Sequence, residues 1–335
     1  MLYVSTRNHN DPYTAARTLN TDFAPDGGLF APYHLPKYER EEIWGLKDLS
    51  FGNVVSRILN VFYSNAVKAS DVDFSIGRTP LRCVGIGHRV IVAELWRNTA
   101  QNYAFIERQL NQKLNPHSTA PTIWVKTAIR VAVLFGVYAQ LLANGQLLPD
   151  QPFDISLDAD DRVGLMASLY SKSMGLPLES VILGCGDSDA LWQLLHQNEI
   201  DTRTLSDAQK LTIELLLHFF YGDSAVQSFL SSASKGEFYT AQNDPLSVIG
   251  GGVFAAVVSS KRIPAMIRSI YHSNHYFIGL ETIAPYGALQ DFRAKSGESR
   301  PTLICVNTRP LNDLNVIADA VGMPVDQIRA SISNF

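Results

Sequence analysis

The chain has 335 residues, 46% of them apolar, and a formal net charge of −4 at pH 7. This composition can fill one large core or two smaller ones, and its mild acidity gives no basic surface for a nucleic acid. We expect no signal peptide and no apolar run long enough to span a membrane. Three scattered cysteines without metal-ligand spacing, Cys83, Cys185 and Cys305, fit a reducing compartment. The sequence therefore predicts a soluble cytoplasmic protein of the α/β class.

Residues 1–85 are predicted to form a mainly helical N-terminal lobe. Its opening carries a glycine-rich tight turn at residues 25–28, within the run APDGGLFAP. A helix is expected within residues 41–70, where Ser50 can cap it. Five apolar residues then line one face of that helix: Val54, Val55, Ile58, Leu59 and Phe62. Residues 71–82 are predicted to be a polar connector.

Residues 86–335 are predicted to form an α/β domain, which opens with a strand at 89–95 and a helix at 102–114. A break at 115–118 separates that helix from a long helix at about 121–143, which ends at Asn144 and Gly145.

The unit that organises this domain is residues 153–183, with the pattern strand, acidic loop, helix, turn and strand. Apolar residues alternate from Phe153 to Leu157, and Gly175 ends the helix that follows. Such a βαβ unit predicts a three-layer fold, in which helices cover a parallel sheet. Ligands of these folds bind at the loop after the first strand. Here that loop carries three carboxylates, Asp158, Asp160 and Asp161.

The remaining pattern predicts helices at 206–221 and 225–231, a strand at 302–306 and a closing helix at 314–321. Between them, residues 248–260 contain three consecutive glycines, Gly250, Gly251 and Gly252, followed by an expected apolar helix. The glycines lack the rest of a nucleotide-binding fingerprint and are predicted to allow close backbone packing. His272 and His275 have a spacing that could bind a metal on a helix, but Ser273-Asn274 between them favours a turn. No metal site is predicted there.

Six short motifs lie in one order along nearly the whole chain. They are YVSTRN with APDGGLFAP, AELW at 93–96, TIWVKTAIRVAVLFGVY at 122–138, the 153–183 unit, DPLSVIG at 244–250 and TLICVNTRP at 302–310. Together they resemble the threonine synthase family, fold-type II enzymes of amino-acid biosynthesis that use pyridoxal phosphate. The resemblance implies the large-domain fold of that family, with a phosphate loop in the 153–183 unit and a cofactor lysine shortly after AELW.

The resemblance fails at the lysine. Laid over AELW without gaps, the family's lysine position is Ala104, and residues 97–106 contain no lysine. A covalent link to the cofactor needs a primary amine, which alanine lacks. The next candidate, Lys113, lies further along the same predicted helix and should point elsewhere. The resemblance therefore implies a cofactor, pyridoxal phosphate, that we expect not to be bound.

The phosphate loop and the pyridine end also depart from the family. Its glycine, asparagine, phenylalanine, glycine loop becomes Asp160, Asp161, Arg162 and Val163. Side chains then fill the space where backbone N–H groups should meet a phosphate. The family's ring-binding threonine corresponds to Asn307 and the histidine that follows it to Arg309, and asparagine could still bond a ring.

A deletion is expected as well. In the family a small domain separates the lysine helix from the next helix, whereas about 111–120 joins them here, too few residues for a domain. One wall of the cofactor site would then be missing. The face so exposed should be covered by a second copy of the chain or by a partner protein.

Three hypotheses follow. The preferred one is a threonine synthase-like protein that has lost catalysis with pyridoxal phosphate and serves as a binding, regulatory or scaffold protein. The second is an enzyme with new carboxylate- or metal-assisted chemistry in the old crevice, and the third a residual lyase-type activity with the cofactor held non-covalently. The crevice candidates are Asp158, Asp160, Asp161, Arg162, Asn307 and Arg309, with His88 nearby. For the aspartates, capping of the next helix is preferred to a metal site.

Overall fold

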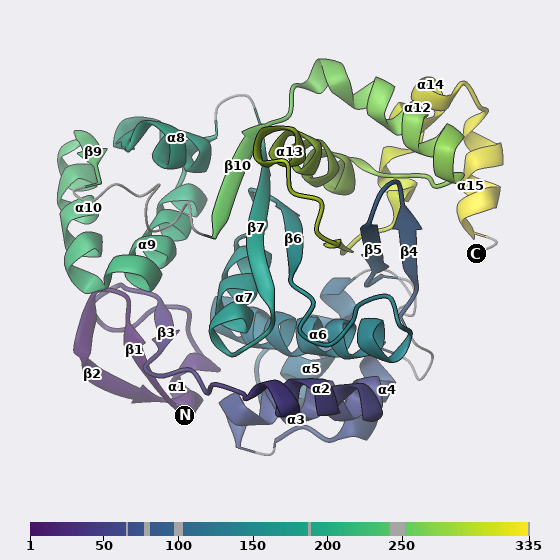
Figure 1. The fold of residues 1–335 in the computed structure, drawn as a ribbon. Coiled ribbons are helices and arrows are strands. Elements are labelled where there is room, and N and C mark those ends of the chain that lie inside the picture. The colour runs from purple at the N-terminus through teal and green to yellow at the C-terminus, as the bar shows by residue number, and fades with distance from the viewer. Residues whose placement is uncertain (65, 77–80, 97–102, 187–188, 242–251, 334–335) are drawn as a thin grey trace.

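The computed structural model describes residues 1–335 except 65, 77–80, 97–102, 187–188, 242–251 and 334–335. The described chain is built around a six-stranded sheet with helices on both faces (Figure 1). The α/β class and the three-layer arrangement predicted from the sequence are therefore confirmed.

The N-terminal lobe opens with a three-stranded antiparallel sheet that the sequence pattern does not predict. Its order is β2 (Asn8–Thr14), β1 (Leu2–Ser5) and β3 (Phe30–Pro32). The helices of the lobe are α1 (Ala15–Thr18), α2 (Arg40–Gly45), α3 (Phe51–Tyr63) and α4 (Ala69–Ile76). Ser50 caps α3 as predicted, since its hydroxyl accepts the Asn53 amide at 3.2 Å. The connector predicted at 71–82 is wrong where α4 lies, because the buried Val72 and Ser75 anchor a short helix there.

The large sheet has the order β10-β7-β6-β11-β5-β4. Its strands are β4 (Cys83–Ile86), β5 (Val90–Glu94), β6 (Phe153–Asp158), β7 (Leu178–Cys185), β10 (Val253–Val257) and β11 (Thr302–Val306). All neighbours are parallel except β4, which pairs antiparallel with β5 at the edge. The division predicted between residues 85 and 86 thus falls inside a strand of this sheet.

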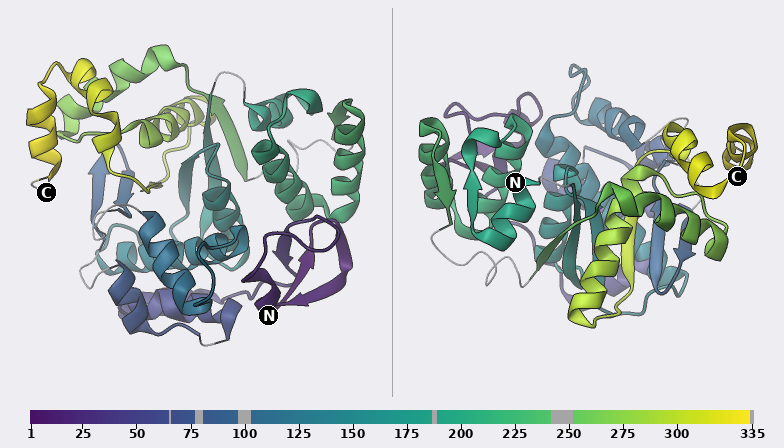
Figure 2. Two further views of the ribbon diagram at one scale, coloured as in Figure 1. Left: turned by 180° about the vertical axis from the view of Figure 1, so that it is seen from behind. Right: turned by 90° about the horizontal axis from the view of Figure 1, so that it is seen from above.

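Side-chain alternation along the strands divides the interior into two cores. In β5, Ile91 and Ala93 face one core, and Val90 and Val92 face the other. The first face is covered by α5 (Tyr103–Leu114), α6 (Ile123–Ala143) and α7 (Arg162–Ser173), with α3 beyond. The second is covered by α12 (Ile263–Asn274), α13 (Leu280–Ser296), α14 (Leu314–Val321) and α15 (Val325–Ser333), as the two turned views show (Figure 2).

Helix α6 is the central helix of the first core. By length and composition it could cross a membrane, contrary to the sequence expectation, but 89% of its apolar window is buried inside the protein. Trp124 at its start packs edge-on against Tyr3 of β1 at 5.2 Å and Phe62 of α3 at 5.5 Å between ring centroids. The N-terminal lobe and the α/β layers therefore share one hydrophobic core.

A group of helices lies to one side of the sheet, next to the N-terminal sheet (Figures 1 and 2). It consists of α8 (Ala190–Gln197), α9 (Asp207–Tyr221) and α10 (Asp223–Lys235), with the hairpin β8 (Glu199–Asp201) and β9 (Phe238–Thr240). The two helices predicted in this region are confirmed. Glu214 of α9 pairs with Arg7 at 2.9 Å and so ties the group to the N-terminal lobe.

The apolar helix predicted after the glycines is wrong. That stretch is the strand β10, and the next helix, α12, begins only at Ile263. A five-residue apolar run fits a buried strand as well as a helix, so periodicity alone cannot decide. Gly250 and Gly251 lie outside the described residues, while the Gly252 carbonyl accepts the Val181 amide at 2.7 Å and extends the β10–β7 pairing.

Candidate functional site

The carboxyl ends of the parallel strands bring most of the predicted site residues to one edge of the sheet. Asp158 ends β6, Asn307 follows β11, and Trp96 follows β5. Because β6, β11 and β5 are adjacent and parallel, these positions share that edge. His88 precedes β5 and lies at the opposite edge, so its predicted place near the crevice is wrong.

Two carboxylates of the acidic loop accept hydrogen bonds from nearby backbone amides. Asp161 caps α7, since its Oδ1 accepts the Gly164 amide at 2.9 Å. Gly164 leaves room for this, because a Cβ there would lie 2.3 Å from Asp161 Oδ2. Asp158 Oδ1 likewise accepts the Asp160 amide at 2.9 Å. The capping hypothesis is therefore confirmed for Asp161, whereas the exposed Asp160 carboxylate makes no hydrogen bond or ion pair with any described residue.

A buried arginine of α6 pairs with the residue that caps α7. Arg130 of α6 is 4% exposed, and its Nη1 lies 3.3 Å from Asp161 Oδ2. Its guanidinium carbon lies 4.1 Å from the ring centroid of Tyr103, over the ring. Burial opposes the charge on Arg130, but Asp161, Tyr103 and Glu107 outweigh it, so the pKa of the guanidinium is raised. Arg130 and Asp161 therefore form a charged ion pair.

The loop after β11 is held by a second carboxylate. Glu281 at the start of α13 accepts the backbone amides of Asn307 and Thr308, each at 3.2 Å, and the Thr308 hydroxyl. The Asn307 side chain has a buried Oδ1 without a hydrogen-bond partner in the described part of the chain. Arg309 lies with its guanidinium carbon 5.2 Å from the ring centroid of Trp96. Backbone contacts set this loop, and Asn307 Oδ1 and Arg309 Nε remain without hydrogen-bond partners in the described part of the chain.

The lysine position of the resemblance falls at the start of α5. Ala104 is the second residue of that helix and is exposed. Lys113, near the other end of α5, pairs with Asp71 of α4 at 2.9 Å, so its ammonium points to the N-terminal lobe as expected. The loop before α5, residues 97–102, lies outside the described residues.

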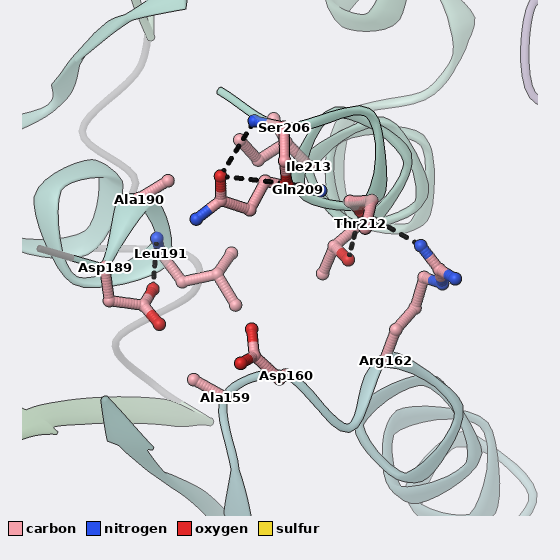
Figure 3. Close-up of a pocket in the computed structure, with 11 residues that line it drawn as sticks. Ala159, Asp160, Arg162, Asp189, Ala190, Leu191, Ser206, Gln209, Thr212 and Ile213 are labelled. Atoms are coloured by element: carbon pink, nitrogen blue, oxygen red, sulfur yellow. Dashed lines mark hydrogen bonds between the residues drawn. The ribbon is translucent and has the colours of Figure 1, made fainter. Parts of the chain in front are cut away.

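Next to the acidic loop is a cavity of about 310 Å³ (Figure 3). The β6–α7 loop and the N-terminal ends of α8 and α9 form its walls. Asp160 and Asp189 lie on one side, and Ser206 and Gln209 lie across from them. The Arg162 side chain turns to α9, where its Nη1 donates to the Ala208 carbonyl at 2.9 Å. The cavity thus places two carboxylates opposite an amide and a hydroxyl.

The electrostatics of this edge disfavour ionised carboxylates. Burial raises the pKa of Asp158 to about 6, and the neighbouring charges of Asp160, Asp161 and Asp189 add to the rise. Burial also raises the pKa of Asp189, although two α8 amides bonded to its Oδ1 oppose the shift. Among the described residues no group of three histidine, cysteine or acidic side chains could hold a metal ion.

Sequence reasoning missed three contributors, Arg130, Asp189 and Gln209. A signal existed for Arg130, because a lone arginine inside the apolar run of TIWVKTAIRVAVLFGVY needs a counter-ion once that helix is buried. Asp189 and Gln209 carried no such signal, since both look like ordinary first-turn helix residues. His272 and His275 form no pair on a helix, because α12 ends at Asn274 and His275 is its left-handed cap. The turn predicted at Ser273-Asn274 is wrong, because both residues belong to the last turn of α12.

Comparisons with known proteins place this geometry in a known fold. Residues 2–79 match the family described as "Threonine synthase N terminus". Threonine synthase from Brucella melitensis, solved with pyridoxal phosphate bound, superposes with a TM-score of 0.82 at 16% identity, over 96% of this chain and 92% of that chain. Threonine synthase from yeast superposes with a TM-score of 0.76 at 14% identity, over 96% of this chain and 90% of that chain. The Escherichia coli enzyme superposes with a TM-score of 0.67 at 14% identity, over 96% of this chain and 92% of that chain. No curated protein matches the chain significantly. The chain therefore has the threonine synthase fold, with an N-terminal segment that matches the N-terminal domain of that family.

Proposed function

We propose that this chain is a threonine synthase-like protein that has lost catalysis with pyridoxal phosphate and acts as a binding, regulatory or scaffold protein. The observation that carries the proposal is at the N-terminus of α7. The chain's own carboxylates occupy the amides of Gly164 and Asp160, in the loop that the family resemblance assigns to the phosphate.

The charge of the loop supports the same conclusion. A phosphate dianion would sit beside Asp158, Asp160 and Asp161, and two like charges 4 Å apart repel by about 4 kcal/mol at an effective dielectric near 20. Arg130, the nearest buried cation, is already paired with Asp161. Helix N-termini bind anions through free N–H groups, and here the amides of Arg162 and Gly164 already have intramolecular acceptors. The residues present do not fit the phosphate of the cofactor.

The other end of the cofactor lacks its anchor by the same resemblance. Ala104 offers no amine, and Lys113 is engaged with Asp71 at 2.9 Å. Residues 115–122 alone connect α5 to α6, which supports the proposed loss of the small domain. We further propose that a second copy or a partner protein covers the face left by that domain. Native mass spectrometry of the purified protein tests this: a bare monomer at all concentrations contradicts self-association.

We also place the protein in a reducing compartment, the cytoplasm. The support is that Cys83, Cys185 and Cys305 are all free thiols, two of them buried.

A second candidate function is acid–base catalysis in the old crevice. The observation in its favour is Asp158, whose pKa of about 6 is suited to proton exchange near neutral pH. A metal-assisted version has less support, because the described residues provide no three-ligand group.

The discriminating experiment is a pyridoxal phosphate titration followed by absorbance, then borohydride reduction and peptide mapping. We expect no saturable spectral change, and only scattered labelling of surface lysines. The matched control is the Ala104→Lys variant, whose new amine should add at most one labelled site without saturable binding, because the phosphate loop is still filled. Saturable binding to the unmodified chain, with the label on one lysine, would refute the proposed function.

A further inference from the structure

We propose that the cavity between Asp160, Asp189 and Gln209 binds a short aliphatic compound that carries an ammonium group and an oxygen acceptor. The inference rests on the proposed function, because a chain that held pyridoxal phosphate would need an anion at this edge of the sheet. Its volume of about 310 Å³ lies at the lower end of small-molecule sites. The ligand should therefore be a small metabolite.

The cavity presents carboxylates from two separate elements without a cation of the chain between them. Asp160 comes from the β6–α7 loop and Asp189 from the cap of α8 (Figure 3). Neither forms an ion pair with any described residue. Arg130 is paired with Asp161. Arg162 also lines the cavity, but its side chain turns to α9 and donates to the Ala208 carbonyl. The wall formed by Asp160 and Asp189 therefore has two carboxylates and no cationic side chain of its own among the described residues.

A bound ammonium would relieve an existing electrostatic strain. Burial and crowding with like charges raise the pKa of both Asp158 and Asp189. A cation near these carboxylates stabilises their ionised forms and so lowers those pKa values. Ligand binding and loss of the proton from Asp189, which lines the cavity, are therefore coupled, and affinity should rise with pH as that carboxylate ionises.

The opposite wall supplies a donor for the other end of the ligand. Gln209 uses its Oε1 to accept from the Ser206 amide and hydroxyl at 2.9 and 3.1 Å. Its side-chain nitrogen makes no hydrogen bond with the described residues and is turned to the cavity (Figure 3). Leu191 and Ile213 give the site apolar surface for methylene groups. The two carboxylates therefore suit an ammonium group, and the apolar surface suits an aliphatic chain. The amide N–H of Gln209 suits an oxygen at the other end of the ligand.

An organic cation fits better than a metal ion. Ca²⁺ takes six to eight oxygen ligands and Mg²⁺ takes six in near-octahedral geometry, part of them water. No described trio of acidic, histidine or cysteine side chains is close enough to hold one. An ammonium needs only a few acceptors and tolerates their wider spacing.

The test uses four probes of one size: 4-amino-1-butanol, n-butylammonium, n-butanol and butyrate. Binding to the full chain is measured by ligand-observed NMR and by the shift in melting temperature. We expect 4-amino-1-butanol to bind best, n-butylammonium more weakly, and the neutral and anionic probes not at all. Asp160→Asn and Asp189→Asn should each weaken binding by about tenfold, the usual effect of losing one charge-assisted bond.

The control variant is Asp207→Asn, which removes a fully exposed carboxylate near the N-terminal end of α9, outside the cavity. It should leave binding unchanged. Three results would each overturn the inference: binding by the Asp160→Asn and Asp189→Asn variants as tight as by the unmodified chain, preference for butyrate, or a melting shift with Mg²⁺ that Asp160→Asn abolishes. The Mg²⁺ result would also favour the metal-assisted alternative to the proposed function. The other two results leave the proposed function in place, because it is tested by the pyridoxal phosphate titration.

Discussion

At the scale of single residues, Asp158 is a carboxylate whose ionisation the fold opposes. Its pKa is raised to about 6, mainly by burial. An acid with a raised folded pKa holds its proton where the unfolded chain has lost it. Its protonation therefore stabilises the fold below the unfolded pKa near 4, and that stability is lost as pH rises through 6. At neutral pH the ionised Asp158 side chain therefore lowers the stability of the fold.

Replacing Asp158 by Asn should therefore stabilise the protein more at pH 7.5 than at pH 4.5. The amide keeps an oxygen for the Asp160 N–H and removes the charge. We expect a gain of about 1–2 kcal/mol at pH 7.5, less than the full cost of a raised pKa because the side chain is partly exposed. Urea denaturation at the two pH values measures it, with Asp207→Asn as the control. A gain of equal size at both pH values would show that ionisation is not the cause.

At the scale of elements, the N-terminus of α7 depends on one carboxylate that serves two partners. Asp161 caps the helix through the Gly164 amide and neutralises Arg130 in the core. Removing a cap costs about 1 kcal/mol, and leaving a buried charge unpaired costs about 3–5 kcal/mol. The adjacent Asp160 has neither role, so the two neighbours form a matched pair for mutation.

We predict that Asp161→Ala lowers the free energy of unfolding by about 3–5 kcal/mol. Asp161→Asn should cost less because asparagine still caps, and Asp160→Ala should change stability by less than about 0.5 kcal/mol. Urea denaturation of the three variants gives these values. In the double variant with Arg130→Met the loss should shrink, because the unpaired charge is gone. Similar losses for Asp160→Ala and Asp161→Ala would contradict the assignment.

The region around α7 shows which features of the fold and of the candidate site can be predicted from the sequence. The alternation from Phe153 to Leu157 and the glycine at 175 predict β6 and α7 correctly, because the periodic burial that creates those patterns is local. The partner of Asp161 could not be predicted, since Arg130 lies 31 residues away on α6 and meets it only through packing. The failure at β10 has the opposite cause, as a short apolar run fits a strand or a helix until its neighbours are known.

At the scale of the whole molecule, the N-terminal lobe is joined to the rest by both apolar and charged contacts. Tyr3 packs on Trp124 in the common core. Glu214 of α9, with a side chain 2% exposed, accepts the Thr6 hydroxyl at 2.5 Å and two Arg7 bonds at 3.1 and 2.9 Å. A core shared by the lobe and the α/β layers predicts one cooperative transition, whereas two independent domains divided at residue 85 would unfold separately.

Glu214→Gln tests the charged contact and the cooperativity together. Arg7 keeps 25% of its side chain exposed, so water can replace part of the lost pairing. The loss should then be about 2–3 kcal/mol, below the range for a fully buried ion. Tryptophan fluorescence and far-ultraviolet circular dichroism should still report one coincident unfolding curve, and Asp207→Asn on the same helix should leave it in place. Two separated curves, with the lobe melting first, would instead favour independent domains, because a weakened contact between such domains releases the less stable one before the other unfolds.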